Sequence, residues 1–212
     1  MRVLKVQGKG RVSVEPDVAT LSFDVETKAK DYADCVSSLN NNTAALRADL
    51  VNAGLSLAEL KTTAFSVRVD SHYKDGQRRL VGYCATHNLH IDVPADKDVL
   101  NRVLRQIAKG QSGAEIRLSF SVKDKDGLRQ KVIANAVHTA KANAQILASA
   151  AGIKLGNLQQ VDYGWAEVRI SDYNASMICE SMEAAPSEMN ADIDPEDVEA
   201  EDNVTLIYEI VD

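Results

Sequence analysis

The stretch that decides the fold is residues 127–151, GLRQKVIANAVHTAKANAQILASAA. Its apolar residues recur every three or four positions, which is the spacing of one face of an α-helix. Asp126 stands where an N-cap oxygen is needed, and Gly152 stands where a left-handed C-cap is needed. Because most residues of the apolar stripe are alanine, the helix must approach its neighbour closely, and a sheet face suits that best. The stretch therefore predicts a long helix packed on a β-sheet.

Two further helices and several strands complete the predicted fold. Apolar residues at helical spacing indicate a second long helix over 29–53 and a shorter helix from about 96 to 109. Alternating apolar residues indicate strands over 3–14, 19–25, 62–73, 79–93, 114–122, 158–170 and 204–210. We expect an α+β fold of two layers, in which a single curved antiparallel sheet carries the two long helices and the shorter helix. We expect residues 1–212 to form a single domain.

Gly8-Lys9-Gly10 interrupts the first strand pattern. The pattern lacks the third glycine of a dinucleotide-binding loop, and no helical pattern opens after it. We therefore predict a turn or bulge between two pieces of strand, and no phosphate site.

The strands over 62–73 and 79–93 form a predicted hairpin about Lys74-Asp75-Gly76. The apolar residues of both strands are odd-numbered, so a two-residue loop would split the apolar faces. A three-residue loop with Gly76 left-handed pairs Val69 with Val81 and keeps one face apolar. We predict this second register.

Charge is unevenly distributed along the chain. The net charge is −7, yet residues 1–170 carry +6 and residues 171–212 carry −13. Residues 171–203 also lose apolar alternation, so we predict an acidic insertion loop over 171–203 before the last strand. Such a loop is either solvated or docked on a basic face, of its own chain or of a neighbouring subunit.

The acidic insertion and the strand over 158–170 together supply a predicted interaction surface. Its members are Asp192, Asp194, Glu196, Asp197 and Glu199 from the insertion, and Tyr163, Trp165 and Arg169 from the strand. Carboxylates suit a basic partner surface, and aromatic and arginine side chains are enriched at interfaces. The same residues are also typical of a solvated loop and of ordinary sheet packing.

The sequence offers no pattern for catalysis, for a metal or for a cofactor. The three cysteines are widely spaced without a Cys-x-x-Cys pair, which disfavours a disulfide scaffold or a zinc site. In the predicted hairpin, His87 and His90 point to opposite faces, and so do Cys84 and His87, which disfavours a histidine metal site and a thiol–imidazole pair. We expect no catalytic residue and no cofactor, because no nucleophile–base pair or carboxylate dyad can be placed.

Nucleic acid and membrane partners are also disfavoured. Arg102, Arg105 and Lys109 form a basic helix edge, but no aromatic residues interleave with them, so we predict no nucleic-acid binding. No run of 18 apolar residues predicts a membrane span. Met1 to Lys5 leads into a strand pattern without an apolar signal segment, so we expect a cytoplasmic location as the sequence is written.

Several short motifs along the chain resemble those of one known family. These are Val6-Gln7-Gly8, Gly10-Arg11-Val12-Ser13-Val14, Pro16-Asp17 with Ala19, Leu60-Lys61-Thr62, Gly82-Tyr83, then Ala134, Ala140, Ala144, Leu147-Ala148 and Gly152, and finally Asp194-Pro195-Glu196 before Val204 and Tyr208-Glu209. Together they resemble the SIMPL-domain proteins, bacterial proteins of unknown function that include periplasmic immunogenic-protein-like members. The resemblance covers nearly the whole chain. It implies an α+β fold with long helices on an antiparallel sheet, a tendency to oligomerise and frequent export to the cell envelope, which would place the chain there if a signal peptide had been removed. It implies no established activity, cofactor or catalytic residue.

Three hypotheses for function follow. The first is a non-enzymatic protein that forms homo-oligomers, with the acidic insertion contacting a neighbouring subunit. The second is an adaptor-type protein-interaction module, which would bind a protein partner through the strand over 163–169 or the basic helix edge. The third is a small-ligand binder or an enzyme with a pocket that the sequence does not reveal.

Overall fold

A computed structural model describes residues 2–74, 77–164, 169–171, 173–175 and 193–211. In chain order the elements are β1 (Val3–Val14), β2 (Val18–Ala29), α1 (Tyr32–Asn52), a 3-10 turn (Leu57–Glu59), β3 (Lys61–Lys74), β4 (Gln77–Pro94), α2 (Lys97–Lys109), β5 (Glu115–Ser121), α3 (Lys125–Ala151), β6 (Lys154–Asp162), β7 (Arg169–Ser171), β8 (Tyr173–Ala175) and β9 (Val198–Val211). The α+β class is confirmed, with two long helices and one shorter helix.

The strands form two sheets, where a single sheet was predicted. One sheet has the order β1-β9-β6, with β7 also paired to β9, and the other has the order β3-β4-β2-β5-β8. The chain accordingly divides into two compact units, which are unit 1 (Met1–Pro16, Val122–Tyr173 and Glu196–Asp212) and unit 2 (Asp17–Ser121 and Asn174–Pro195). The single-sheet prediction is wrong because β1 pairs with β9, from the other end of the chain, and β2 pairs with β4 and β5. Alternation shows which face of a strand is buried, but not which strand lies beside it.

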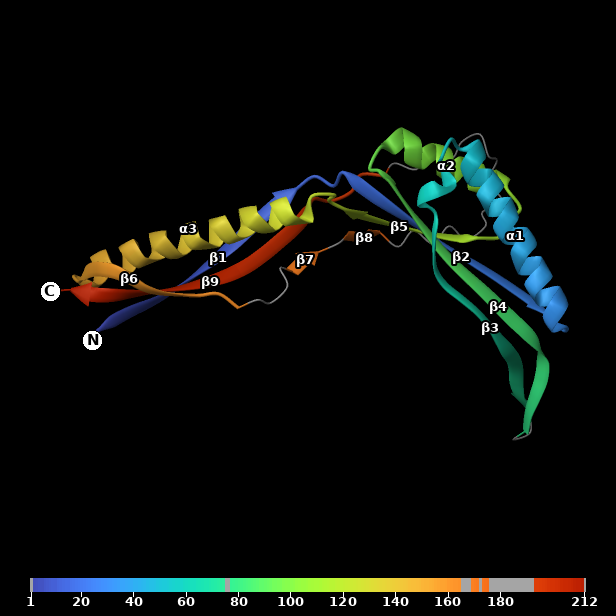
Figure 1. Cartoon of the computed structure of the whole chain (residues 1–212), viewed down its shortest axis with the longest axis horizontal. Helices are drawn as coiled ribbons and strands as arrows, with labels where there is room; N and C mark the ends of the chain where they lie inside the picture. Colours follow the sequence, from blue (N-terminus) through green and yellow to red (C-terminus); the bar gives the residue numbers. More distant parts are fainter. Residues whose placement is uncertain (1, 75–76, 165–168, 172, 176–192, 212) are drawn as a thin grey trace. The chain divides into compact units, whose positions relative to one another are not determined.

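Unit 1 consists of α3 packed on one face of its sheet (Figure 1). Two glycines of β1 make close packing possible, because a Cβ at Gly8 would lie 2.7 Å from Ala140 Cα, and a Cβ at Gly10 would lie 2.9 Å from Ala136 Cβ. The predicted close approach of an alanine stripe to a sheet is therefore confirmed. The predicted turn at Gly8-Lys9-Gly10 is wrong, because these residues lie inside one continuous strand. The glycines are needed for the helix to approach, and no bend is formed.

The ends of α3 follow the expected capping chemistry with one shift. Asp124, and not Asp126, is the N-cap residue, and its Oδ1 accepts a hydrogen bond of 2.8 Å from the backbone N–H of Gly127. Asp126 lies in the first turn, where its charge faces the positive end of the helix dipole. Gly152 has φ +66° and ends the helix in the left-handed conformation, as predicted.

Unit 2 packs α1 and α2 over its sheet around a core of large side chains. The largest fully buried side chains of this core include Leu21 and Phe23 of β2, Leu39 and Leu46 of α1, and Phe120 of β5. Ile193 is buried in the same core, although it lies within the segment predicted to be an acidic loop. Its burial anchors the end of that segment to unit 2.

The β3–β4 hairpin has a different register from the one predicted. Val69 pairs with Tyr83 and Val67 with Ala85, whereas the prediction paired Val69 with Val81. Lys74 pairs with Gln77, and the register shifts by one residue between Asp70 and Ser71. This irregularity, and not a three-residue turn, pairs odd-numbered residues with odd-numbered ones along the body of the hairpin. Gly76, on which the prediction relied, lies outside the described residues.

The strand boundaries near the acidic segment also differ from the prediction. The strand expected over 158–170 is β6 at Lys154–Asp162 together with the separate β7 at Arg169–Ser171. The last strand begins at Val198, so residues 198–203 of the predicted insertion belong to β9. Acidic residues alternate there with buried Val198 and Ala200, which is a strand pattern that the high acidic content obscured.

Candidate interaction surface

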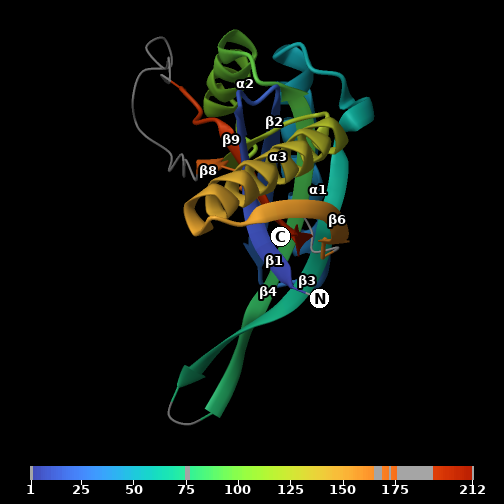
Figure 2. The same ribbon diagram turned by 90° about the vertical axis from the view of Figure 1, so that its left-hand side faces the viewer.

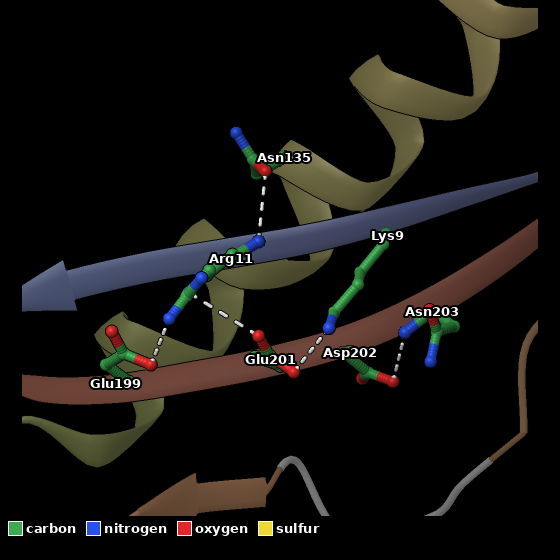
Figure 3. Close-up of polar contacts among 7 residues, drawn as sticks. All are labelled: Lys9, Arg11, Asn135, Glu199, Glu201, Asp202 and Asn203. Atoms are coloured by element: carbon green, nitrogen blue, oxygen red, sulfur yellow. Dashed lines mark hydrogen bonds and ion pairs between the residues drawn. The ribbon is translucent and has the colours of Figure 1, made fainter.

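A ladder of opposite charges covers the sheet face of unit 1 that points away from α3 (Figure 3). Lys9 Nζ lies 2.6 Å from Glu201 Oε2, Arg11 Nη2 lies 2.5 Å from Glu199 Oε2, and Arg11 Nε lies 3.5 Å from Glu201 Oε1. We call these four residues the charge ladder. Arg11 is directly opposite Glu201 in the β1–β9 register, so each cation reaches an opposite or diagonal carboxylate across the strand pair.

The side chains of the charge ladder are partly exposed to solvent. Its two cations and two carboxylates belong to the same chain, so their charges sum to zero. The hydrogen bond that Arg11 donates to Glu199 and the negative charge of this carboxylate raise the pKa of Arg11. Exposed ion pairs of this kind contribute little to stability, but they favour one strand register over another. Sequence analysis did not single out Lys9 or Arg11. The signal was the polar residue at every odd position of β1 from Lys5 to Ser13, and it was missed because the partner carboxylates were assigned to a loop.

The acidic residues of the predicted interaction surface are divided between the two units. Asp194 belongs to unit 2 and lies 3.1 Å from Lys97 Nζ. Asp197 and Glu199 belong to unit 1, where Asp197 Oδ2 accepts a 2.6 Å hydrogen bond from Ser13 Oγ. Glu196 is exposed, and Asp192 lies outside the described residues. Three of the five acidic side chains are therefore bonded to their own chain.

The two strand residues of the predicted surface that the structure describes, Tyr163 and Arg169, both lie beside β9. Tyr163 Oη donates a 2.7 Å hydrogen bond to Asp202 Oδ2, and this bond raises the pKa of Tyr163. The tyrosine packs on the cluster formed by α3 and β9, as ordinary sheet packing would have it. Arg169 is the first residue of β7 and pairs with Glu201 through the backbone register. Trp165 lies outside the described residues.

A two-stranded arm of unit 2 exposes large apolar side chains. We define the arm as residues 69–74 of β3 and 77–82 of β4, which starts at the last β2–β4 pair, Ala29 with Tyr83, and continues beyond it (Figure 1 and Figure 2). The exposed fractions are 48% for Val69, 63% for Leu80 and 47% for Val81. Leu80 pairs with Ser71, and Val81 is the residue that the register shift skips, so the regular alternation of side chains is interrupted at this point. Sequence alternation could not find the arm, because it does not show where a neighbouring strand ends.

His87 and Cys84 of β4 lie on opposite faces, as predicted. His87 Nδ1 lies 3.3 Å from Thr43 Oγ1 of α1, and His87 Nε2 lies 2.9 Å from Thr62 Oγ1 of β3. Burial lowers the pKa of His87, which favours the neutral ring between the two hydroxyl groups. Cys84 is buried beside Glu26, and burial raises the pKa of its thiol. Neither arrangement has the geometry of an activated nucleophile.

In the part of the chain that the structure describes, no group of three or more histidine, cysteine, aspartate or glutamate side chains is placed to hold a metal ion. Among the same residues, no helix has both the length and the apolar character needed to cross a bilayer.

Comparison with known proteins identifies the family. The sequence matches SIMPL, described as "Protein of unknown function (DUF541)", over residues 4–208. The chain belongs to the SIMPL family. The resemblance of its short motifs to SIMPL-domain proteins is thereby confirmed.

Members of the SIMPL family from several bacteria are similar over most of their length. The uncharacterized protein YggE of Escherichia coli strain K12 is 25% identical over 205 residues, which cover 96% of this chain and 81% of YggE. YggE of Edwardsiella ictaluri is 26% identical over 181 residues, with 85% and 73% covered. The 26 kDa periplasmic immunogenic protein of Brucella melitensis biotype 1 is 24% identical over 169 residues, with 74% and 65% covered.

Proposed function

We propose that this SIMPL protein is non-enzymatic and works by assembling with further copies of itself. The observation that carries the proposal is the arm, which exposes Val69, Leu80 and Val81 to solvent at about half or more of their surface. Scattered apolar residues are normal on a protein surface and others are exposed on α3 and β6, but these three share one two-stranded element that extends beyond β2. A two-stranded ribbon without further packing is marginally stable in water. Contact with a second copy would bury these side chains and stabilise the arm.

The outer edge of β3 adds a second reason. β3 is the terminal strand of its sheet and is 14 residues long, so one row of its backbone groups faces away from β4. Long edge strands are templates for pairing with another chain unless they are covered or interrupted. An assembly through the arm would use this edge together with the exposed apolar side chains.

The test is the solution mass of the full chain. We expect the wild type to be larger than a monomer by light scattering, and the double variant Leu80→Ser with Val81→Ser to shift toward the monomer. The matched control is Ile146→Ser in α3 of unit 1, which removes an isoleucine that is 65% exposed outside the arm. A monomeric wild type, or an arm variant with the wild-type mass, would reject the proposal.

We also propose that the acidic insertion contacts the neighbouring subunit. The charge of −13 on residues 171–212 against +6 on residues 1–170 supports it. Asp194, Asp197 and Glu199 are bonded within their own chain, so the proposal assigns the contact mainly to the acidic residues at 176–192. Replacing 176–192 with a short Gly-Ser linker should lower the solution mass. A second variant replaces Glu180, Glu183, Glu188 and Asp192 by their amides and keeps the length of the segment. It should lower the solution mass as the linker variant does if charge drives the contact. An unchanged mass in the linker variant would overturn this part alone.

The alternative is an adaptor that uses the same arm to bind a different protein. The exposed apolar side chains fit either partner, so the solution mass decides between them. A monomeric wild type that gains mass only with a partner protein would favour the adaptor. No observation in the described part of the chain favours a small-ligand binder or an enzyme.

We propose the periplasm as the compartment. The name of the Brucella melitensis relative, a periplasmic immunogenic protein, favours it over the cytoplasmic location expected from the first residues. Fractionation of cells that express the chain from its own gene should place it with periplasmic markers. Recovery with cytoplasmic markers would support the earlier expectation.

A further inference from the structure

The outer edge of β1 is the second long strand edge in the molecule, and α3 lies against it. β1 is the terminal strand of the unit 1 sheet, and among the described residues its only pairing partner is β9. The residues of β1 that face α3 include Gly8 and Gly10, and their lack of a side chain lets the helix come into contact with the strand backbone. The helix therefore packs over the strand that would otherwise present an open edge.

The register shows which backbone groups point to this edge. The N–H of Ile210 donates to the carbonyl of Arg2 at 2.9 Å, so these two opposite residues form a hydrogen-bonded pair. Hydrogen-bonded and non-hydrogen-bonded pairs alternate in an antiparallel ladder. Even-numbered residues of β1 therefore bond to β9, and the N–H and C=O groups of its odd-numbered residues point outward.

Two asparagines of α3 bond to outward-pointing groups of β1. Asn135 Oδ1 accepts the backbone N–H of Arg11 at 3.2 Å (Figure 3), and Asn143 Nδ2 donates to the carbonyl of Gln7 at 3.1 Å. The two are eight residues apart, and the two β1 residues are four apart, so one helix face follows the strand edge. Asn135 supplies an acceptor and Asn143 supplies a donor. These are the kinds of group that the backbone of an added strand would supply.

We propose that Asn135 and Asn143 close the outer edge of β1 against strand addition by a second copy of this chain. They occupy backbone groups that an added strand would need, and the bulk of α3 stands beside them. This inference does not depend on the arm, which belongs to the other sheet. It implies that assembly through the unit 1 sheet is blocked at β1.

The first test measures how well Asn135 protects the outer edge of β1, by amide hydrogen exchange on the full chain. We expect Asn135→Ala to speed exchange of the Arg11 amide by at least about tenfold, ~1.4 kcal/mol. Asn135→Asp keeps the acceptor and should retain protection. The matched control is Thr139→Ala, because Thr139 lies midway between the two asparagines and its hydroxyl bonds to the Asn135 carbonyl of its own helix. Equal exchange of the Arg11 amide in wild type and Asn135→Ala would overturn the inference.

The second test asks whether the opened edge accepts a strand. Asn135→Ala with Asn143→Ala is made in the background of the arm variant, so that the arm cannot account for any new assembly. Alanine favours helix, so α3 should still form. We expect the solution mass to rise with concentration, and the amides of Lys5, Gln7 and Lys9 to become protected as it rises. A mass equal to that of the background variant would overturn the inference, and so would new protection confined to β3. If the arm variant is itself still assembled, the proposed function is wrong. The exchange of the Arg11 amide still tests the closure of the β1 edge by Asn135, because that measurement does not depend on assembly.

Discussion

Both units pack helices on a sheet, but unit 1 does so with small residues and unit 2 with large side chains. In unit 1 the contact is made by Gly8 and Gly10 against Ala136 and Ala140, so the helix lies directly on the strand. In unit 2 the space between layers is filled by large residues such as Phe23. Removing atoms should therefore harm unit 2 most, and adding atoms should harm unit 1 most.

The largest expected effect is in unit 2. Phe23→Ala should lower the free energy of unfolding by about 3–5 kcal/mol, because the fully buried ring leaves a cavity that the layers cannot close. Urea denaturation followed by circular dichroism would measure it. Phe65→Ala is the control, since Phe65 is 53% exposed. Similar losses in the two variants would contradict the described core.

The next effect tests the close packing of unit 1. Gly8→Ala adds a single methyl group, yet it should cost about 3 kcal/mol because the new atom meets helix backbone, which cannot move aside as a side chain can. Gly113→Ala is the control, because Gly113 has φ +61° with no atom within 4 Å of the added Cβ. That control should cost ~1 kcal/mol from backbone strain alone. If Gly8→Ala proved the milder variant, the account of α3 packing on β1 would fail.

The pH response should come from unit 2, where Asp49 is buried and its Oδ2 has no hydrogen-bond partner among the described residues. Burial raises the pKa of Asp49. The folded chain thus keeps this proton to higher pH than the unfolded chain, whose carboxyl titrates near ~4. The contribution of Asp49 to the free energy of unfolding is fully present below the pKa of the unfolded chain. It is lost as the pH rises through the raised pKa of Asp49 in the folded chain.

Asp49→Asn should remove this pH dependence. The urea midpoint of the variant is expected to exceed that of the wild type increasingly as pH rises from about 4 toward 7. Asp34→Asn, an exposed residue in the first turn of the same helix, is the control. Parallel pH profiles for Asp49→Asn and the wild type would count against a raised folded pKa.

The smallest effect is expected from the charge ladder of unit 1. Glu199→Gln breaks the Arg11–Glu199 ion pair, and because both groups are solvent-exposed the loss of stability should be slight. The difference from the wild type should vanish at about 1 M salt, where charges are screened over ~3 Å. Asp194→Asn, which breaks the exposed pair with Lys97 in unit 2, is a matched comparison. A loss that persisted in high salt would mean that the ladder acts through packing and not through charge.

Local features of the fold were predictable, and pairings were not. The α3 stripe, its glycine C-cap and its close approach to a sheet all follow from residues 127–152, because helix formation and capping depend on neighbours in the sequence. The division into two sheets depends on β1 meeting β9, about 200 residues away. The residue pattern within β1 or β9 does not indicate which strand pairs with it.

The candidate site shows the same contrast. The acidic residues were correctly recognised as a distinct feature, but Glu199 was assigned to a loop because its neighbours are also acidic. The cations that bond to the acids, Arg11 and Lys97, lie 188 and 97 residues away in sequence, so only the folded chain could reveal them. The contact of the acidic insertion with a neighbouring subunit stays a prediction, as does the single domain over 1–212.

The pairing of β1 with β9 has a consequence for synthesis of the protein. β1 finds its partner only when β9, about 200 residues later in the chain, has been made, so the unit 1 sheet cannot close before that point. Residues 17–121, by contrast, hold β2 to β5 and both of the helices of unit 2 in one uninterrupted stretch. Unit 2 can therefore acquire most of its structure while synthesis continues. Until β9 has been made, the edge of β1 that pairs with it stays open, and a chaperone that binds unpaired strands would protect it during that period.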